Sequence, residues 1–207
     1  YHGRLFYGFH GSTAITKRLA LRILDFVYFH ISKFSNFHIN KSVHLLINTS
    51  INMNYEAKIE ELELQLPPVS APKGLYKPMV IAGNLAYLSG HVSATSNGTL
   101  IHGKVGDDLD MEAGKLAARA AGLAILATLR HELGSLNKIK RVVKLFGMVN
   151  ATPDFDKHPY VINGCSELME EVFGTEHGVG ARSAFGVSGL PGNCAVEIEA
   201  IFELNGL

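Results

Sequence analysis

The amino-acid sequence predicts an α+β fold in which two helices pack on one face of a mixed β-sheet. The first observation is the order of the periodic segments from residue 76 onward: strand, strand, helix, strand, helix, strand, strand. The second is the last segment, residues 195–204, where apolar residues occupy every second position as in a strand with one buried face. The third is residues 111–133, whose alanine-rich helix face can lie close against a sheet.

Residues that start or stop secondary structure delimit the elements. Asp110 is a natural N-cap for the long helix, and Gly134 ends it. Gly83 and Asn84 are typical of the turn of a tight hairpin, and Pro159 opens the second helix. The segments so delimited are helices at 55–66, 111–133 and 159–173 and strands at 76–82, 85–92, 141–149, 181–187 and 195–204.

The zero net charge of the chain conceals two segments of different composition. Residues 1–52 contain six Lys or Arg and one acidic residue, whereas residues 53–207 contain thirteen and eighteen. We therefore expect a poorly ordered N-terminal extension at 1–52 and one domain at 53–207. Because the chain begins at Tyr1 and Met53 opens a segment of ordinary composition, we favour an extension that is not native coding sequence. A transit peptide is the second interpretation and a packing appendage the third.

The composition also bears on location and partners. Residues 20–31 are the longest apolar stretch near the N-terminus, but Arg22 and Asp25 interrupt them and they are too short for a membrane helix. Cys165 and Cys194 cannot build a disulfide framework, so we expect free thiols in the cytoplasm, or in the mitochondrion if residues 1–52 are a transit peptide. Neither the cysteines nor the histidines have metal-ligand spacing, and zero net charge gives no general attraction to nucleic acid or membrane.

Arg182 is the residue that the strand pattern singles out. It shares a strand face with Ala184 and Gly186, so its guanidinium has open space beside it. A planar guanidinium in such a space can hold a small carboxylate through two parallel hydrogen bonds. The competing interpretation is a structural ion pair with Glu197 or Glu199, or a snorkelling edge residue, and parity alone slightly favours it.

Three short motifs, in the right order, resemble the YjgF/RidA family, the reactive intermediate deaminases. The motifs are A-R-S-A at 181–184 with G-L-P at 189–191 and V-E-I-E-A-I at 196–201, G-N-L-A-Y-L-S-G-H at 83–91, and D-F at 154–155 with V-I-N at 161–163. The resemblance spans about residues 74–204 and excludes residues 1–52. Residues 103–106 and 142–144 are more similar to the branch labelled chorismate-mutase-like or "putative endoribonuclease".

The resemblance implies a chorismate-mutase-like fold, a homotrimer with clefts between neighbouring subunits, and a hydrolase that needs no metal or organic cofactor. The implied reaction converts 2-imino acids to 2-oxo acids and ammonia. Arg182 matches the residue that grips the substrate carboxylate, and Glu197 matches the residue that holds the water, either as general base or by orienting it. The matching cleft-lining positions are Tyr76, Gly90, Asn163 and Ala184, the last of which is often cysteine in the family.

Two features of the sequence leave other functions open. His91 replaces the glutamine of the family motif and adds a titratable group near the cleft. A basic cluster is the one feature that favours RNA cleavage, for which parts of the family are named, although a solvated edge is the simpler interpretation. It consists of Lys138, Lys140, Arg141 and Lys144. A non-catalytic sensor of small carboxylates is the third hypothesis.

Overall fold

The computed structural model describes residues 54–206, so the expected N-terminal extension lies outside the described residues. The elements are α3 (Tyr55–Glu61), β1 (Met79–Ala82), β2 (Leu85–Val92), α4 (Met111–Leu133), β3 (Ile139–Asn150), α5 (His158–Gly178), β4 (Ala181–Val187) and β5 (Val196–Leu204). Single 3₁₀ turns precede β3 and β5. None of the described helices is long and apolar enough to cross a membrane.

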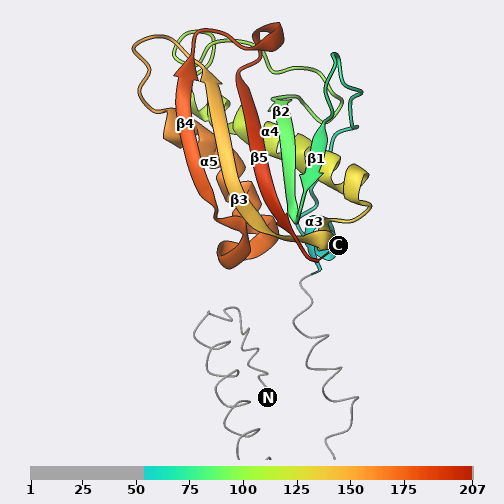
Figure 1. The fold of residues 1–207 in the computed structure, drawn as a ribbon. Helices are drawn as coiled ribbons and strands as arrows, with labels where there is room; N and C mark the ends of the chain where they lie inside the picture. Colours follow the sequence, from blue (N-terminus) through green and yellow to red (C-terminus); the bar gives the residue numbers. More distant parts are fainter. Residues whose placement is uncertain (1–53, 207) are drawn as a thin grey trace, which may run out of the picture. The chain divides into compact units, whose positions relative to one another are not determined.

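The five strands form one mixed sheet in the order β1-β2-β5-β3-β4. All neighbouring strands are antiparallel except β3 and β4, which are parallel and are joined through α5. Figure 1 shows α4 and α5 side by side behind the sheet, with α4 behind β2 and β5 and α5 behind β3 and β4. The predicted α+β fold, a mixed sheet with two helices on one face, is therefore confirmed.

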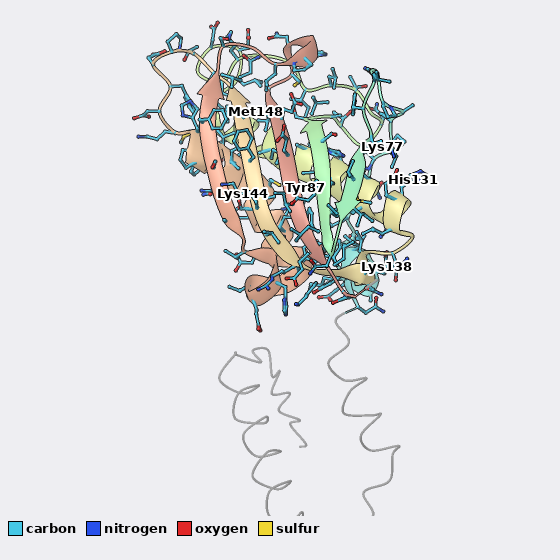
Figure 2. The ribbon with its side chains drawn as sticks, in the orientation of Figure 1. Lys77, Tyr87, His131, Lys138, Lys144 and Met148 are labelled. Atoms are coloured by element: carbon cyan, nitrogen blue, oxygen red, sulfur yellow. The ribbon has the colours of Figure 1, made fainter. Side chains whose placement is uncertain are left out.

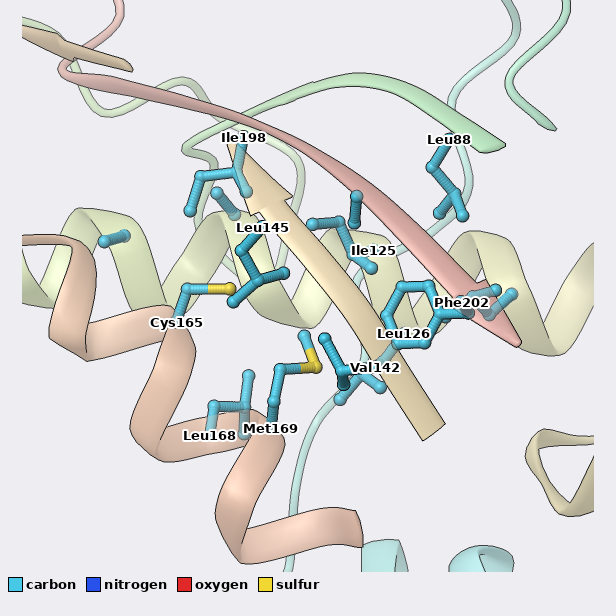
Figure 3. Packing of buried hydrophobic residues seen from close by; sticks show 14 of the residues in the cluster. Leu88, Ile125, Leu126, Val142, Leu145, Cys165, Leu168, Met169, Ile198 and Phe202 are labelled. Atoms are coloured by element: carbon cyan, nitrogen blue, oxygen red, sulfur yellow. The ribbon is translucent and has the colours of Figure 1, made fainter. Parts of the chain in front are cut away.

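The hydrophobic core lies between these helices and the sheet. The predicted inward face of β5 is confirmed, because Ile198 and Phe202 are fully buried between exposed or partly exposed neighbours. Figure 3 shows Ile198, Leu145 and Phe202 pointing from the sheet toward Cys165 and Met169 of α5. In Figure 1, none of the helices within residues 54–206 covers the strand faces that turn away from this core.

The long helix begins and ends where the sequence predicts. The Asp110 carboxylate accepts a hydrogen bond from the Ala113 N–H at 2.7 Å, which satisfies a free donor of the first turn. Gly134 adopts a left-handed conformation with φ 78°, and its N–H donates to the Arg130 carbonyl. The ends of α4 are thus determined by local chemistry that the sequence displays.

The predicted first helix, residues 55–66, is too long, because α3 ends at Glu61. Leu62, Leu64 and Leu66 alternate with polar residues and each packs against the core, which is the period of an extended chain. Glu63 takes a positive φ of 52°, and the Leu64 N–H donates to the Ile59 carbonyl, so the helix closes before the leucines. The packing of these leucines against the core, rather than the following prolines, determines this boundary.

Other predicted boundaries shift by a few residues. The strand expected from residue 76 begins at Met79, since Pro78 has no N–H for the ladder and its carbonyl instead accepts from the Ser89 N–H at 3.0 Å. Three further strands are observed at 139–150, 181–187 and 196–204. The regular part of α5 is interrupted at Gly174, with φ 75° and ψ 163°, next to the predicted end at residue 173.

Candidate functional site

A β-bulge in β2 shapes the first part of the candidate site. Leu88 pairs with Ala200 and His91 pairs with Ile198. Between these two pairs β2 contains one residue more than β5. The bulge returns His91 to the helix side of the sheet, whereas simple alternation from Leu88 would place it on the opposite side. Because β1 stops pairing at Leu88, no strand of residues 54–206 pairs with this edge of β2 from Ser89 onward.

The carboxylate of Glu197 lies directly over Gly90 of this bulge. An atom placed at the Cβ position of Gly90 would collide with Oε1 of Glu197, so only glycine allows the carboxylate its position. Glu197 is partly buried, and this desolvation raises the pKa of its carboxyl above the ordinary value, with a further contribution from Glu199. The Glu197 carboxylate therefore accepts a proton more readily than the carboxylate of an exposed glutamate.

We expect Gly90→Ala to lower any activity that depends on the Glu197 carboxylate at least tenfold while the protein stays folded. The new methyl group meets the flexible end of the Glu197 side chain, so the carboxylate moves while the backbone keeps its path. The check is kcat/KM together with the thermal unfolding midpoint. Gly83→Ala is a less informative control because its φ of 60° strains any alanine. Gly189→Ala, which meets no atom within 4 Å, is the matched control.

Tyr76 lies beside the same bulge. Its ring folds back over Gly74, whose Cβ position is 3.5 Å from the ring, and 52% of the residue is exposed. The connection to the bulge runs through Ser89, which donates its hydroxyl to the Lys77 carbonyl at 2.7 Å. The segment that carries Tyr76 is thus attached to the strand that carries Gly90.

His91 and Thr128 connect the bulge to α4, a contact that the sequence did not predict. His91 Nδ1 lies 2.7 Å from the Ser89 carbonyl oxygen and must donate to it, since a carbonyl only accepts. Nε2 lies 2.8 Å from the Thr128 hydroxyl, which therefore donates to it in the neutral imidazole. Burial lowers the pKa of His91 below its ordinary value, against the opposing effect of the Ser89 hydrogen bond. The imidazole is accordingly uncharged at neutral pH.

A pocket of about 630 Å³ joins these residues. Its lining includes Tyr76, Gly90, His91, Thr128 and Glu197. The rest of its wall comes largely from the proline-rich connector at 67–74 and from the turn after β4. Half of the predicted site residues therefore face one cavity within a single chain.

Arg182 lies elsewhere, on the edge strand β4, and its guanidinium faces α5. Nη1 donates to Oδ1 of Asn163 at 2.6 Å and to Oγ of Ser166 at 3.1 Å. The ion pair with Glu197 or Glu199 is not formed, because Arg182 points to the helix side of the sheet and both glutamates alternate with core residues of β5. Within residues 54–206, no carboxylate neutralises this exposed guanidinium.

Asn163 and Ala184 accompany Arg182. The Asn163 amide oxygen fixes the guanidinium, and the partly buried Ala184 packs against the core on the same strand face. Ser166 is the partner that sequence reasoning missed, although its position three residues after Asn163 on a helix gave a usable signal. The six predicted site residues thus form two groups, one around Glu197 and one around Arg182, and the single chain does not bring the groups together.

The basic cluster that favoured RNA cleavage is largely occupied by contacts within the chain. Lys140 and Arg141 both bind the carboxylate of Glu203, at 2.8 and 2.6 Å. Lys138 donates to the Leu133 carbonyl and Lys144 to the Ser183 hydroxyl. Among residues 54–206, His, Cys, Asp and Glu form no group of three or more that is suited to a metal ion.

Comparison with known proteins finds relatives that match this chain over nearly their whole length. Protein TCP17 of Trypanosoma cruzi is 40% identical over 149 residues, which cover 72% of this chain and 93% of that protein. The crystal structure of a protein of unknown function from Agrobacterium tumefaciens is 38% identical with a TM-score of 0.67, covering 77% of this chain and 99% of that one. The crystal structure of a "putative endoribonuclease" from Shewanella oneidensis is 30% identical with a TM-score of 0.69. The match covers 73% of this chain and 99% of that one.

The sequence model of one protein family accounts for nearly all of the described residues. The family is described as "YjgF/chorismate mutase-like, putative endoribonuclease", and its model matches residues 56–204. The match includes both groups of site residues, and it confirms the resemblance that the sequence motifs indicated. The chain therefore belongs to the YjgF/chorismate-mutase-like family.

Proposed function

We propose that this protein hydrolyses reactive 2-imino acids to 2-oxo acids and ammonia, with the substrate carboxylate bound by Arg182. The observation that carries the proposal is the state of the Arg182 guanidinium, which is exposed, held in place by the neutral Asn163 and Ser166, and not neutralised by any described carboxylate. Such a group is oriented in advance and retains its full attraction for an anion.

We infer further that the complete site lies between neighbouring copies in a homotrimer, because the Arg182 group and the Glu197 group do not meet within one chain. The sheet face that none of the described helices covers supports this assembly. Its surface includes the cross-strand neighbours Val80 and Tyr87, which are 51% and 43% exposed, and the rings of Phe146 and Phe185, which pack edge to face. Tyr87 projects from this face in Figure 2. Exposed apolar side chains on such a sheet face are suited to contact with other copies.

The chemistry requires little of the protein. Water adds to the imine carbon, the resulting carbinolamine transfers a proton to its nitrogen, and the C–N bond breaks to release ammonia and leave the 2-oxo acid. Arg182 fixes the carboxylate and thereby the position of the neighbouring imine carbon. Glu197 receives the proton of the attacking water and returns it to the departing nitrogen, a role that its raised pKa favours.

Glu197→Gln is expected to abolish most of the activity and to stabilise the protein slightly at neutral pH. Above the raised pKa of Glu197 the charged carboxylate is partly desolvated and close to Glu199, and the neutral amide removes this cost. Since Glu197 is only partly buried, the gain should be below about 1 kcal/mol. The gain should disappear as the pH falls through the pKa of Glu197, where the wild-type carboxyl also becomes neutral. Thermal unfolding midpoints measured across this pH range test it, and a variant that is less stable at neutral pH would contradict it.

The proposed reaction is tested by following freshly generated 2-iminopropanoate with and without the protein. Faster disappearance of the imine, with matching release of ammonia, supports the deaminase. Binding of 2-oxobutanoate without any acceleration would favour a sensor. Cleavage of RNA that survives Arg182→Ala but is lost in a Lys140→Ala, Arg141→Ala variant would favour a nuclease, provided that the wild type has been freed of contaminating nuclease.

A further inference from the structure

The pocket beside Glu197 is much larger than the smallest imino acids require. Its volume of about 630 Å³ lies within the range of pockets that enclose drug-sized ligands. 2-Iminopropanoate carries only a methyl group as its side chain and would leave most of this volume to water. A substrate that is bound at its carboxylate by Arg182 and attacked beside Glu197 must direct its side chain somewhere, and this pocket adjoins Glu197.

The wall of the pocket is mostly apolar. It includes Pro68, Val69, Pro72, Leu100, Ala124 and Pro191. Within this wall Gly98 lies next to Pro68, and Gly192 lies next to Leu100: a Cβ atom at these glycines would be 4.0 Å from Cγ of Pro68 and 3.0 Å from Cδ1 of Leu100. The charged side chains in the lining are Glu197 and the exposed Lys73.

Several hydrogen-bonding groups of the lining are already used within the chain. His91 is bound to the Ser89 carbonyl and to the Thr128 hydroxyl, and it stays neutral in doing so. A polar substrate side chain would therefore lose its water without gaining new partners from these groups. An apolar side chain gains from the same burial.

We propose that the imino acids accepted by this protein carry a bulky apolar side chain, of the size found in leucine or phenylalanine, which occupies the pocket beside Glu197. This inference rests on the proposed deaminase function and specifies its substrate class. Because each additional methylene in an apolar pocket changes specificity about 10- to 200-fold, the leucine- and phenylalanine-derived imines should exceed 2-iminopropanoate at least tenfold in kcat/KM.

The experiment compares imino acids generated in the assay from alanine, leucine, phenylalanine and glutamate. The expected order places the leucine and phenylalanine imines first and the alanine and glutamate imines at least tenfold below them. Equal rates, or a preference for the alanine imine, would overturn the substrate class and leave the deaminase function intact. A preference for the glutamate imine would also overturn it and would point to Lys73 as the partner of a second carboxylate. If no imine is hydrolysed, both proposals fail.

Two variants test the pocket itself. Ala124→Phe fills it from α4 and should lower kcat/KM for the leucine imine at least tenfold, while the value for 2-iminopropanoate stays within about twofold. Ala94→Leu fills the pocket from the loop after β2. It allows the same two kcat/KM values to be compared if Ala124→Phe does not fold. Leu116→Phe on the 68% exposed outer side of α4 is the control and should change neither value. An unchanged ratio in both pocket variants would overturn the proposal.

Discussion

Replacing Arg182 by alanine is expected to lower kcat/KM for 2-imino acids about 10²- to 10³-fold. Loss of one member of a hydrogen-bonded charge pair typically costs about 2–5 kcal/mol, and each 1.36 kcal/mol is a factor of ten in rate. The loss should also extend to binding of the product, since the 2-oxo acid carries the same carboxylate. Steady-state kinetics on the imine and calorimetric titration with the 2-oxo acid measure the two effects.

The stability of the Arg182→Ala variant should be close to that of the wild type. Its guanidinium is exposed, and its hydrogen-bond partners among residues 54–206 are the neutral Asn163 and Ser166 of α5. Surface positions of this kind usually change stability by no more than about 0.5 kcal/mol. An unchanged thermal unfolding midpoint would therefore show that the activity is lost through the site and not through unfolding.

Arg119→Ala is the matched control for this experiment. Arg119 also lies at the surface and also contacts α5, but its guanidinium is occupied by Glu171 through two bonds of 3.2 and 2.6 Å. Its removal should leave kcat/KM unchanged. Arg182→Lys should recover only part of the activity, because an ammonium group cannot reproduce the planar two-bond geometry. Full activity in Arg182→Ala would rule out the proposed role of this residue.

The parts of the fold that the sequence predicts correctly are those with a strong local period or a capping residue. The inward face of β5 follows from its alternation, and the bounds of α4 follow from Asp110 and Gly134. The first helix was predicted too long because Leu62 and Leu64 are compatible with both a helix and an extended chain. Their tertiary contacts with the core, which a local pattern does not contain, decide between the two.

The candidate site shows a similar division. Strand parity correctly groups Arg182 with Ala184, but the partners Asn163 and Ser166 come from a helix whose rotation over the sheet depends on packing. The sequence analysis did not predict the bulge in β2, although Gly90 inside a strand pattern is a usable signal for one. The contact between His91 and Thr128 depends on the bulge and on the packing of α4, and strand alternation alone places His91 on the opposite face.

Mixed oligomers of the Arg182→Ala and Glu197→Gln variants are expected to regain activity that neither variant has alone. If each cleft takes its arginine from one copy and its glutamate from the neighbour, some clefts in a mixed trimer combine the two intact halves. In a trimer that contains both variants, one of the three clefts combines both wild-type groups, so the activity of the isolated mixed oligomers should rise to about a third of the wild-type value. Co-expression with two different tags, followed by purification on both, isolates the mixed oligomers for the assay.

Recovery of activity in the mixed oligomers tests whether Arg182 of one copy acts together with Glu197 of a neighbouring copy. The matched control is a mixture of Arg182→Ala with the double variant Arg182→Ala, Glu197→Gln, in which no cleft can contain an arginine. This mixture should stay inactive even though it forms the same assembly. A shared cleft contains both wild-type groups whenever one neighbour contributes Arg182 and the other contributes Glu197. If the mixture of Arg182→Ala with Glu197→Gln is also inactive, the two groups therefore act within one copy or do not act together.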